Sequence, residues 1–226
     1  MQVAFFVLTL LVILYGPSLW VGSVIKHYHR EQNYPGTGAQ FARHLLNRLS
    51  LEQVLVEMTN QGDHYDPIAK AVRLSKLCFE GKSLSAITIA AHEVGHAIQD
   101  ASNMPLFRWR TRLALLAFHA ERMGSVVMLL VPVITLLTRT PASGLLTFLL
   151  GAAIMGSASL VHLVTLPVEM DASFQRALPL LEAGGYLKPQ HSQAAHRILR
   201  AAAFTYLAAS LSSLLNLGRW WALWRR

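Results

Sequence analysis

The feature that most limits how this chain can fold is a set of long apolar runs. Residues 3–25 carry no charged side chain, and a helix of about 20 apolar residues crosses the hydrocarbon core of a bilayer. Two further runs, 123–137 and 144–166, are joined by a stretch that allows only a tight hairpin, and a weaker fourth run, 198–217, is interrupted by Arg200. These runs predict a mainly helical integral membrane protein, in which the fourth run either crosses the membrane or lies in its interface.

The composition agrees with lipid as part of the solvent. Charged residues make up 14% of the chain, whereas soluble domains average about 25%. The net charge of +8 would also suit a nucleic-acid-binding protein. However, the basic residues flank apolar runs, and no zinc-finger spacing or RNA-binding aromatic motif accompanies them, so we expect membrane lipid and no nucleic acid as a partner. The single cysteine, Cys78, excludes an internal disulfide and a CxxC metal site.

Basic residues near the ends of the apolar runs predict the orientation of the chain. Lysine and arginine are enriched in cytoplasmic loops, and four arginines fall between 108 and 122, whereas the hairpin contains only Arg139. The polar segments are therefore expected in the cytoplasm. The predicted organisation comprises a transmembrane anchor at 3–25, a cytoplasmic unit at 26–122, a transmembrane hairpin at 123–166, a cytoplasmic segment at 167–197, a transmembrane or interfacial helix at 198–217 and a basic, tryptophan-rich tail at 218–226.

An H-E-x-x-H motif, with His92, Glu93 and His96 at its defined positions, lies in the apolar stretch 85–100. Residues i and i+4 of a helix share one face, so both imidazoles can bind a single ion, and imidazole is a good zinc ligand. Glu93 lies beside that face, where it can accept a proton from the attacking water. The apolar spacing predicts a buried helix, and Gly95 would allow close packing against a neighbour.

A catalytic zinc site usually has three protein ligands and one open position, so a third ligand must come from another part of the chain. The metzincin form of the motif, which continues with a glycine and a third histidine, is absent. Glu169 is the preferred candidate, because the predicted topology returns it to the same membrane face as the motif. Asp171 and His162 are the alternatives, although Asp171 would point to another side of its helix and His162 lies about two turns deeper in the apolar run.

Four segments lie in order along most of the chain: Asp63–Pro67 (DHYDP), Val72–Ser75 (VRLS), Ala91–Gln99 (AHEVGHAIQ) and Leu166–Glu169 (LPVE). Together they resemble the YugP-like family of neutral zinc metallopeptidases in bacterial membranes. The arrangement is also similar to the gluzincin plan of membrane proteases of the HtpX and CAAX prenyl protease type. The resemblance implies Zn²⁺ as cofactor, His92, His96 and Glu169 as its ligands, and Glu93 as general base. It implies a protease class and no particular substrate.

The segment 63–75 predicts a turn followed by a half-buried strand, because apolar and polar residues alternate at its end. Two interpretations stay open. In the zinc peptidases that the chain resembles, an edge strand beside the metal helix binds extended substrate through its backbone. Val72, Arg73 and Leu74 would then contact substrate, with His64 as a further polar contact. Alternatively, the segment is only a structural turn and strand, and His64 lies at the solvated surface.

These features predict a membrane-bound zinc metalloendopeptidase with a zincin-like cytoplasmic catalytic unit that carries a small β element. We expect a multi-pass protein of the bacterial cytoplasmic membrane that cleaves membrane proteins or peptides at the cytoplasmic face. One alternative is a non-catalytic zinc-binding membrane chaperone or assembly factor. Glu93 argues against it, because a structural zinc site needs no base and is usually closed by a fourth protein ligand. A channel or transporter has little support, since only His162 and Arg200 interrupt the apolar runs.

Overall fold

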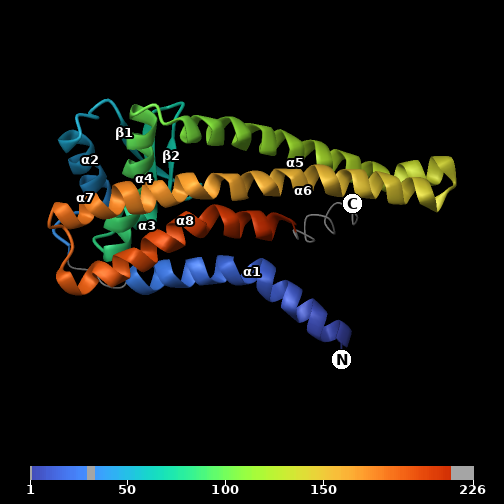
Figure 1. Cartoon of the computed structure of the whole chain (residues 1–226), viewed down its shortest axis with the longest axis horizontal. Helices are drawn as coiled ribbons and strands as arrows, with labels where there is room; N and C mark the ends of the chain where they lie inside the picture. Colours follow the sequence, from blue (N-terminus) through green and yellow to red (C-terminus); the bar gives the residue numbers. More distant parts are fainter. Residues whose placement is uncertain (1, 30–33, 215–226) are drawn as a thin grey trace. The chain divides into compact units, whose positions relative to one another are not determined.

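The computed structural model describes residues 2–29 and 34–214, apart from some side chains within α1, α6 and α8 (Figure 1). The described chain is mainly helical with one small sheet, as the sequence predicts. Its helices are α1 (Gln2–His29), α2 (Gly38–Arg48), α3 (Lys76–Glu80), α4 (Leu84–Ala101), α5 (Pro105–Thr138), α6 (Pro141–Met170), α7 (Leu178–Ala183) and α8 (Ser192–Leu214), with a π-helix η1 (Asp171–Ala177) and a short 3₁₀ helix η2 (Pro189–His191). The strands are β1 (Leu55–Thr59), β2 (His64–Asp66) and β3 (Ala71–Ser75).

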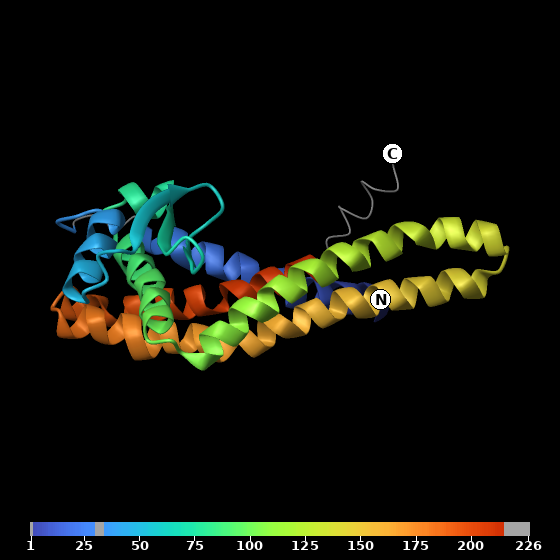
Figure 2. The ribbon, with the colours of Figure 1, turned by 90° about the horizontal axis from the view of Figure 1, so that it is seen from above.

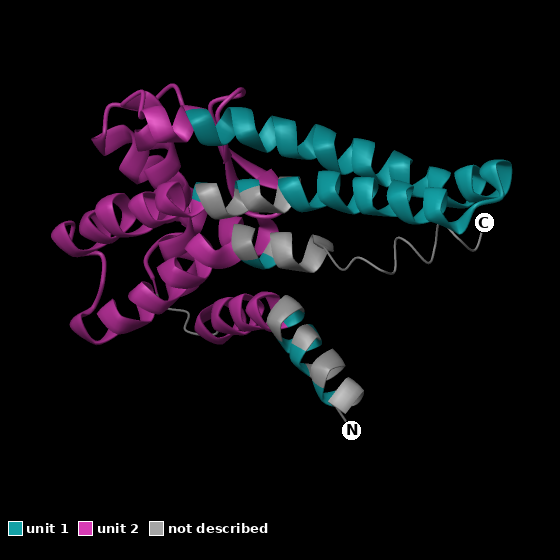
Figure 3. Cartoon of the chain, turned by 45° about the vertical axis from the view of Figure 1, so that its right-hand side comes forward, with its two compact units in different colours: residues 1–15, 109–165, 206–226 teal, residues 16–108, 166–205 magenta. Residues whose placement is uncertain are grey.

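The chain divides into two compact units (Figure 3). The first unit comprises residues 1–15, 109–165 and 206–226, and the second comprises residues 16–108 and 166–205. The boundaries fall inside α1, α5, α6 and α8, because each of these helices continues from one unit into the other.

In the first unit, α5 and α6 form the expected helical hairpin, joined by a turn at residues 139–140. Glycines allow the two helices to approach each other closely. A Cβ atom added at Gly144 would lie 2.0 Å from Oγ1 of Thr135, and one at Gly124 would lie 2.6 Å from Cγ of Met155. The apolar run predicted at 123–137 forms the second half of α5, a longer helix that begins at Pro105.

Within the part of the chain that the structure describes, one helix, α5, is long and apolar enough to cross a membrane. A second apolar helical stretch, Pro141–Ser157, is shorter. The spans predicted at 3–25, 144–166 and 198–217 include side chains outside the described part, so they stay predictions. The tail at 218–226 lies wholly outside the described residues.

In the second unit, the three-stranded sheet lies beside α2 and α4 (Figures 1 and 2). The central strand is β3, which pairs in parallel with β1 and antiparallel with β2. The predicted alternation is confirmed, since Val72 and Leu74 are fully buried and Arg73 is partly exposed. Val72 and Leu74 do not lie on an edge strand, because β3 is the central strand; the edge strand within the segment 63–75 is β2.

The centre of the second unit is α4, which is buried along almost its whole length. The Ser83 side chain accepts a hydrogen bond from the Ala86 N–H and so caps the start of this helix. Leu84, Ile87 and Val94 of α4 pack in the main hydrophobic core with residues of α2 and β3. An apolar helix that is surrounded in this way gives rigid support to the polar side chains that it carries.

Candidate metal centre

The metal centre forms where α4 meets the end of α6. A Cβ atom added at Gly95 would lie 2.7 Å from the carbonyl oxygen of Ala172, so only glycine lets α4 approach η1 this closely. This confirms the close packing predicted for Gly95. The segment facing it, Asp171–Ala177, is a π-helix that follows Glu169 almost directly, and π-helical turns are frequent at functional sites.

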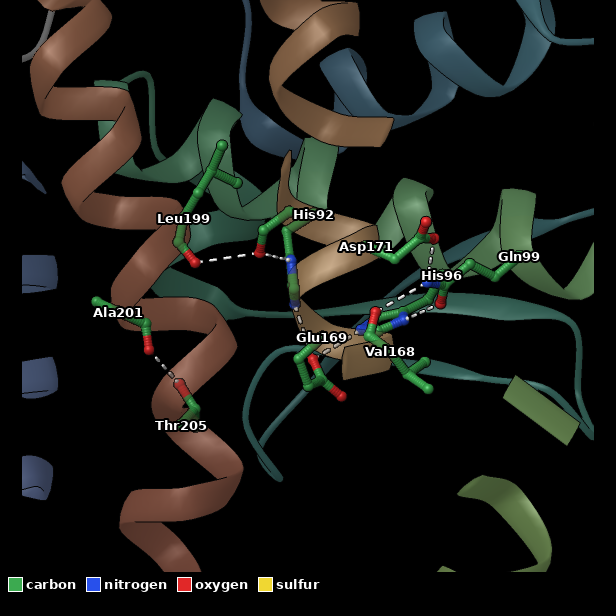
Figure 4. Close-up of polar contacts among 10 residues, drawn as sticks. His92, His96, Gln99, Val168, Glu169, Asp171, Leu199, Ala201 and Thr205 are labelled. Carbon is green, nitrogen blue, oxygen red and sulfur yellow. Dashed lines mark hydrogen bonds and ion pairs between the residues drawn. The ribbon is translucent and has the colours of Figure 1, made fainter. Parts of the chain in front are cut away.

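Three side chains from these two helices converge in the protein interior (Figure 4). The Nε2 atoms of His92 and His96 lie 3.4 and 3.1 Å from Oε2 of Glu169, and all three side chains are buried. In a tetrahedral zinc site with bonds of about 2.1 Å, the ligand atoms are about 3.4 Å apart. These separations fit such a site, and a bound cation would compensate the charge of the fully buried Glu169 carboxylate.

Gln99 determines which nitrogen of His96 can bind a metal. Its Nε2 group donates hydrogen bonds to the Val168 carbonyl at 2.9 Å and to Oδ2 of Asp171 at 2.8 Å. The Gln99 Oε1 atom therefore faces Nδ1 of His96, at 2.8 Å, and can only accept. Consequently Nδ1 carries the proton and Nε2 keeps the lone pair, and Nε2 faces Glu169 (Figure 4).

Ser173 determines which nitrogen of His92 can bind a metal. Its hydroxyl donates to the Leu199 carbonyl at 3.1 Å, so its oxygen accepts from Nδ1 of His92 at 3.0 Å. In this tautomer Nε2 of His92 carries the lone pair that can bind a metal. This contact also connects the site to α8, because Leu199 belongs to that helix.

The alternatives for the third ligand take other positions. Oδ2 of Asp171 accepts hydrogen bonds from Gln99 and from Nε of Arg176, and Asp171 is not among the residues whose ligand atoms converge. His162 lies within α6, and its side chain is outside the described part of the chain. Among the described residues, Glu169 is thus the one that completes a group of three ligands with the two histidines.

Glu93 is buried beside His92 on α4, with 5% of its surface exposed. Its carboxylate is close enough to the Cys78 thiol of α3 to affect it. Burial first, and then the charges of Asp63 and Glu93, raise the pKa of Cys78 well above its ordinary value. The thiol therefore stays protonated, and Glu93 has a neutral neighbour on that side.

The residues expected to contact substrate are spread over the sheet. Val72 and Leu74 face the core, whereas the guanidinium of Arg73 binds Glu57 at 3.0 Å and Asp66 at 2.5 Å. These ion pairs fix Arg73 across the three strands and indicate a structural role for its side chain.

His64 lies on β2, at an edge of the sheet, with Nδ1 2.9 Å from the Gly62 carbonyl. Neighbouring Tyr65 packs against Phe107, which in turn packs against His96. The edge strand next to the metal helix is therefore β2.

The sequence reasoning missed the positioning roles of Gln99 and Ser173. Gln99 lies three residues after His96, on the same side of the helix, and it is a fully buried amide in an apolar helix. That placement was the available signal. Ser173 gave no signal, because its distance from His92 along the chain hides the contact.

Two histidines one turn apart on a helix, with a glutamate from a second helix, form a group of three ligands that can hold a zinc ion. Comparison with known proteins agrees. A family model described as "Putative neutral zinc metallopeptidase" matches residues 3–225, and the chain belongs to this family. The chain is also 34% identical over 227 residues to "Putative membrane protease YugP" of Bacillus subtilis (strain 168), with 90% of each chain covered. No solved structure matches it.

Proposed function

We propose that the protein is a membrane-bound zinc metalloendopeptidase that hydrolyses peptide bonds of membrane proteins or peptides at the cytoplasmic face. The observation that carries this proposal is the convergence of His92, His96 and Glu169, with Glu93 beside them on the same buried helix. Three protein ligands leave one position of a tetrahedral zinc for water or substrate. That is the arrangement of a catalytic site, whereas a structural site is usually closed by four protein ligands.

The side chains divide the chemistry between them. Nε2 of His92, Nε2 of His96 and a carboxylate oxygen of Glu169 would hold the zinc, which polarises the scissile carbonyl and lowers the pKa of water. Glu93 accepts the proton of the attacking water and then transfers it to the leaving amine. Gln99 and Ser173 keep both imidazoles in the tautomer that binds metal.

The first unit supports a membrane location. Both helices of its hairpin expose large apolar side chains to the surroundings, and an exposed apolar surface of this extent needs a partner such as lipid. Examples are Leu115, Leu116, Phe118, Leu136, Leu137, Leu145 and Leu146, each more than half exposed. The name of the Bacillus relative, a membrane protease, points the same way. The arginines at 108–122 favour the cytoplasmic face for the adjoining metal centre.

The edge of the sheet gives a means of binding an extended peptide. β2 is an outer strand, and its backbone can pair with a substrate strand. His64 lies on this strand, where its imidazole can contact a substrate side chain. We therefore assign substrate binding to β2 and not to the central strand β3, which includes Val72 and Leu74.

The test compares Glu93→Gln with Glu80→Gln, which makes the same chemical change at an exposed residue. Each full-length protein is purified in detergent and loaded with zinc, and its zinc content is measured by elemental analysis. Cleavage of a library of unstructured peptides is then followed by mass spectrometry. We expect zinc in all three proteins, and cleavage by the parent and Glu80→Gln only.

The same experiment separates the alternative function. A non-catalytic zinc-binding chaperone or assembly factor would bind zinc and cleave nothing in the parent as well as in the variant. Full activity of Glu93→Gln would reject the role of Glu93 as the base. A parent that binds no zinc would contradict the proposed metal centre itself.

A further inference from the structure

A cavity lies between α1 and α8 within the second unit. It has a volume of ≈ 530 Å³ and is lined by Arg197 and Arg200 of α8 and by Trp20, Ser23, His27 and Tyr28 of α1. The two helices run side by side in opposite directions (Figure 1). None of the metal-centre residues lines this cavity, so the peptidase site does not account for it.

Two arginines give the cavity a positive charge. Arg197 and Arg200 are three residues apart, so their side chains share one face of α8. In the part of the chain that the structure describes, neither guanidinium is paired with a carboxylate. Arg197 donates a hydrogen bond to the Tyr28 hydroxyl at 3.4 Å. Moreover, residues 2–29 and 192–214 include no aspartate or glutamate, so neither helix supplies a compensating charge.

The cavity also lies where charged helix ends meet apolar runs. Residues 3–25 of the chain carry no charge before Lys26, and residues 201–218 carry none after Arg200. Trp20 is 41% exposed, and tryptophan is typical of the interface between membrane and water. A ligand that uses the whole surface must therefore combine an anionic group with apolar chains.

We propose that this cavity binds the phosphate group of an anionic phospholipid. Arginine binds phosphate oxygens through paired N–H donors, and the Tyr28 hydroxyl, which accepts from Arg197, can donate a further hydrogen bond. The acyl chains would lie along the apolar residues of α1 and α8 that adjoin the cavity within the second unit. Inorganic phosphate shares the headgroup chemistry, but it would leave the adjoining apolar surface unused. The proposal rests on the membrane location argued above and needs no peptidase activity.

The test measures lipid binding to the full-length protein by native mass spectrometry in detergent. The parent is titrated with dioleoyl-phosphatidylglycerol and, separately, with dioleoyl-phosphatidylcholine, which has the same acyl chains but no net charge. We expect the first phosphatidylglycerol molecule to bind at least ten times more tightly than the first phosphatidylcholine molecule. The double variant Arg197→Gln/Arg200→Gln should lose that preference. The control Lys76→Gln/Lys188→Gln removes two charges at exposed positions and should keep it.

A second arm adds millimolar inorganic phosphate to the phosphatidylglycerol titration. Displacement of the lipid by phosphate at this concentration would show a free-phosphate site and overturn the proposal. Equal binding of both lipids, or the same loss in the lysine control, would also overturn it.

The single variant Arg200→Gln keeps the hydrogen bond between Arg197 and Tyr28, and it should still weaken binding severalfold if the double variant does not fold. Zinc content, measured on the same samples, reports separately on the metal centre.

Discussion

Replacing Gln99 tests the claim that a buried amide determines the metal-binding form of His96. The Gln99 side chain makes hydrogen bonds to His96, to the Val168 carbonyl and to Asp171. Removing a partner of a ligating histidine typically lowers metal affinity 10–100-fold, which corresponds to about 1.4–2.7 kcal/mol. We expect a loss of this size in Gln99→Ala.

The same substitution should also lower the stability of the metal-free protein. The buried Val168 carbonyl would lose its side-chain donor, which costs about 1–3 kcal/mol if no other group replaces it. Asp171 is partly exposed and keeps its contact with Arg176, so its contribution should be small. Thermal denaturation of the metal-free protein measures this part of the effect by itself.

A variant that keeps only the hydrogen-bond acceptor of Gln99 separates the effect on zinc affinity from the effect on stability. Gln99→Glu still offers an oxygen to Nδ1 of His96, but it loses both donors and places a second carboxylate near Asp171. We expect zinc affinity closer to the parent than in Gln99→Ala, together with a comparable or larger loss of stability.

Zinc affinity is measured by competition with a chelating dye, and Gln193→Ala is the control because Gln193 is exposed. Unchanged zinc affinity in Gln99→Ala would refute the claim that Gln99 positions His96.

Three further predictions follow from the geometry. Gly95→Ala should destabilise the fold by about 1–3 kcal/mol or more in thermal denaturation, because the new Cβ would lie 2.7 Å from the Ala172 carbonyl oxygen; parent-like melting would contradict the close approach. Glu169→Ala should lose most of its zinc in elemental analysis, whereas Asp171→Ala should keep it, and the reverse result would exchange their roles. The free energy of unfolding should decrease above about pH 8.5, because the unfolded thiol of Cys78 loses a proton there while burial, first among the causes, raises the pKa of the folded thiol. This part of the stability is fully present below that pH and is lost by at most about 1.4 kcal/mol per pH unit as the pH rises. The unfolding free energy of Cys78→Ala should depend less steeply on pH from pH 7 to 10. An identical slope in the two proteins would argue against a raised pKa of the Cys78 thiol.

The metal ligands could be predicted from the sequence to an unusual degree. His92 and His96 share one face of α4 because their spacing matches one helical turn, and this is a local property of the chain. Glu169 required one long-range step, the return of a helical hairpin to the membrane face where it began. The length and polarity of the apolar runs carry that information, so the structure brings together the three residues expected.

The sheet shows where this kind of reasoning ends. Alternation along 72–75 correctly indicates a half-buried strand, but the pattern is the same for a central strand and an edge strand. Pairing depends on the neighbours, and β2 is only three residues long, too short for a clear pattern. The order of strands, and with it the position of the free edge, is decided by the tertiary structure.

The sequence by itself therefore indicated most of the helices, the two histidines of the metal centre and the glutamate between them, because these follow from local periodicity or from a motif with fixed spacing. Only the tertiary structure decided how those groups are supported. The contacts of Ser173 with His92, and of Arg197 with Tyr28, join residues far apart in the chain. Such contacts depend on how whole helices pack, and packing is set by the three-dimensional fit of many side chains, which no local pattern records.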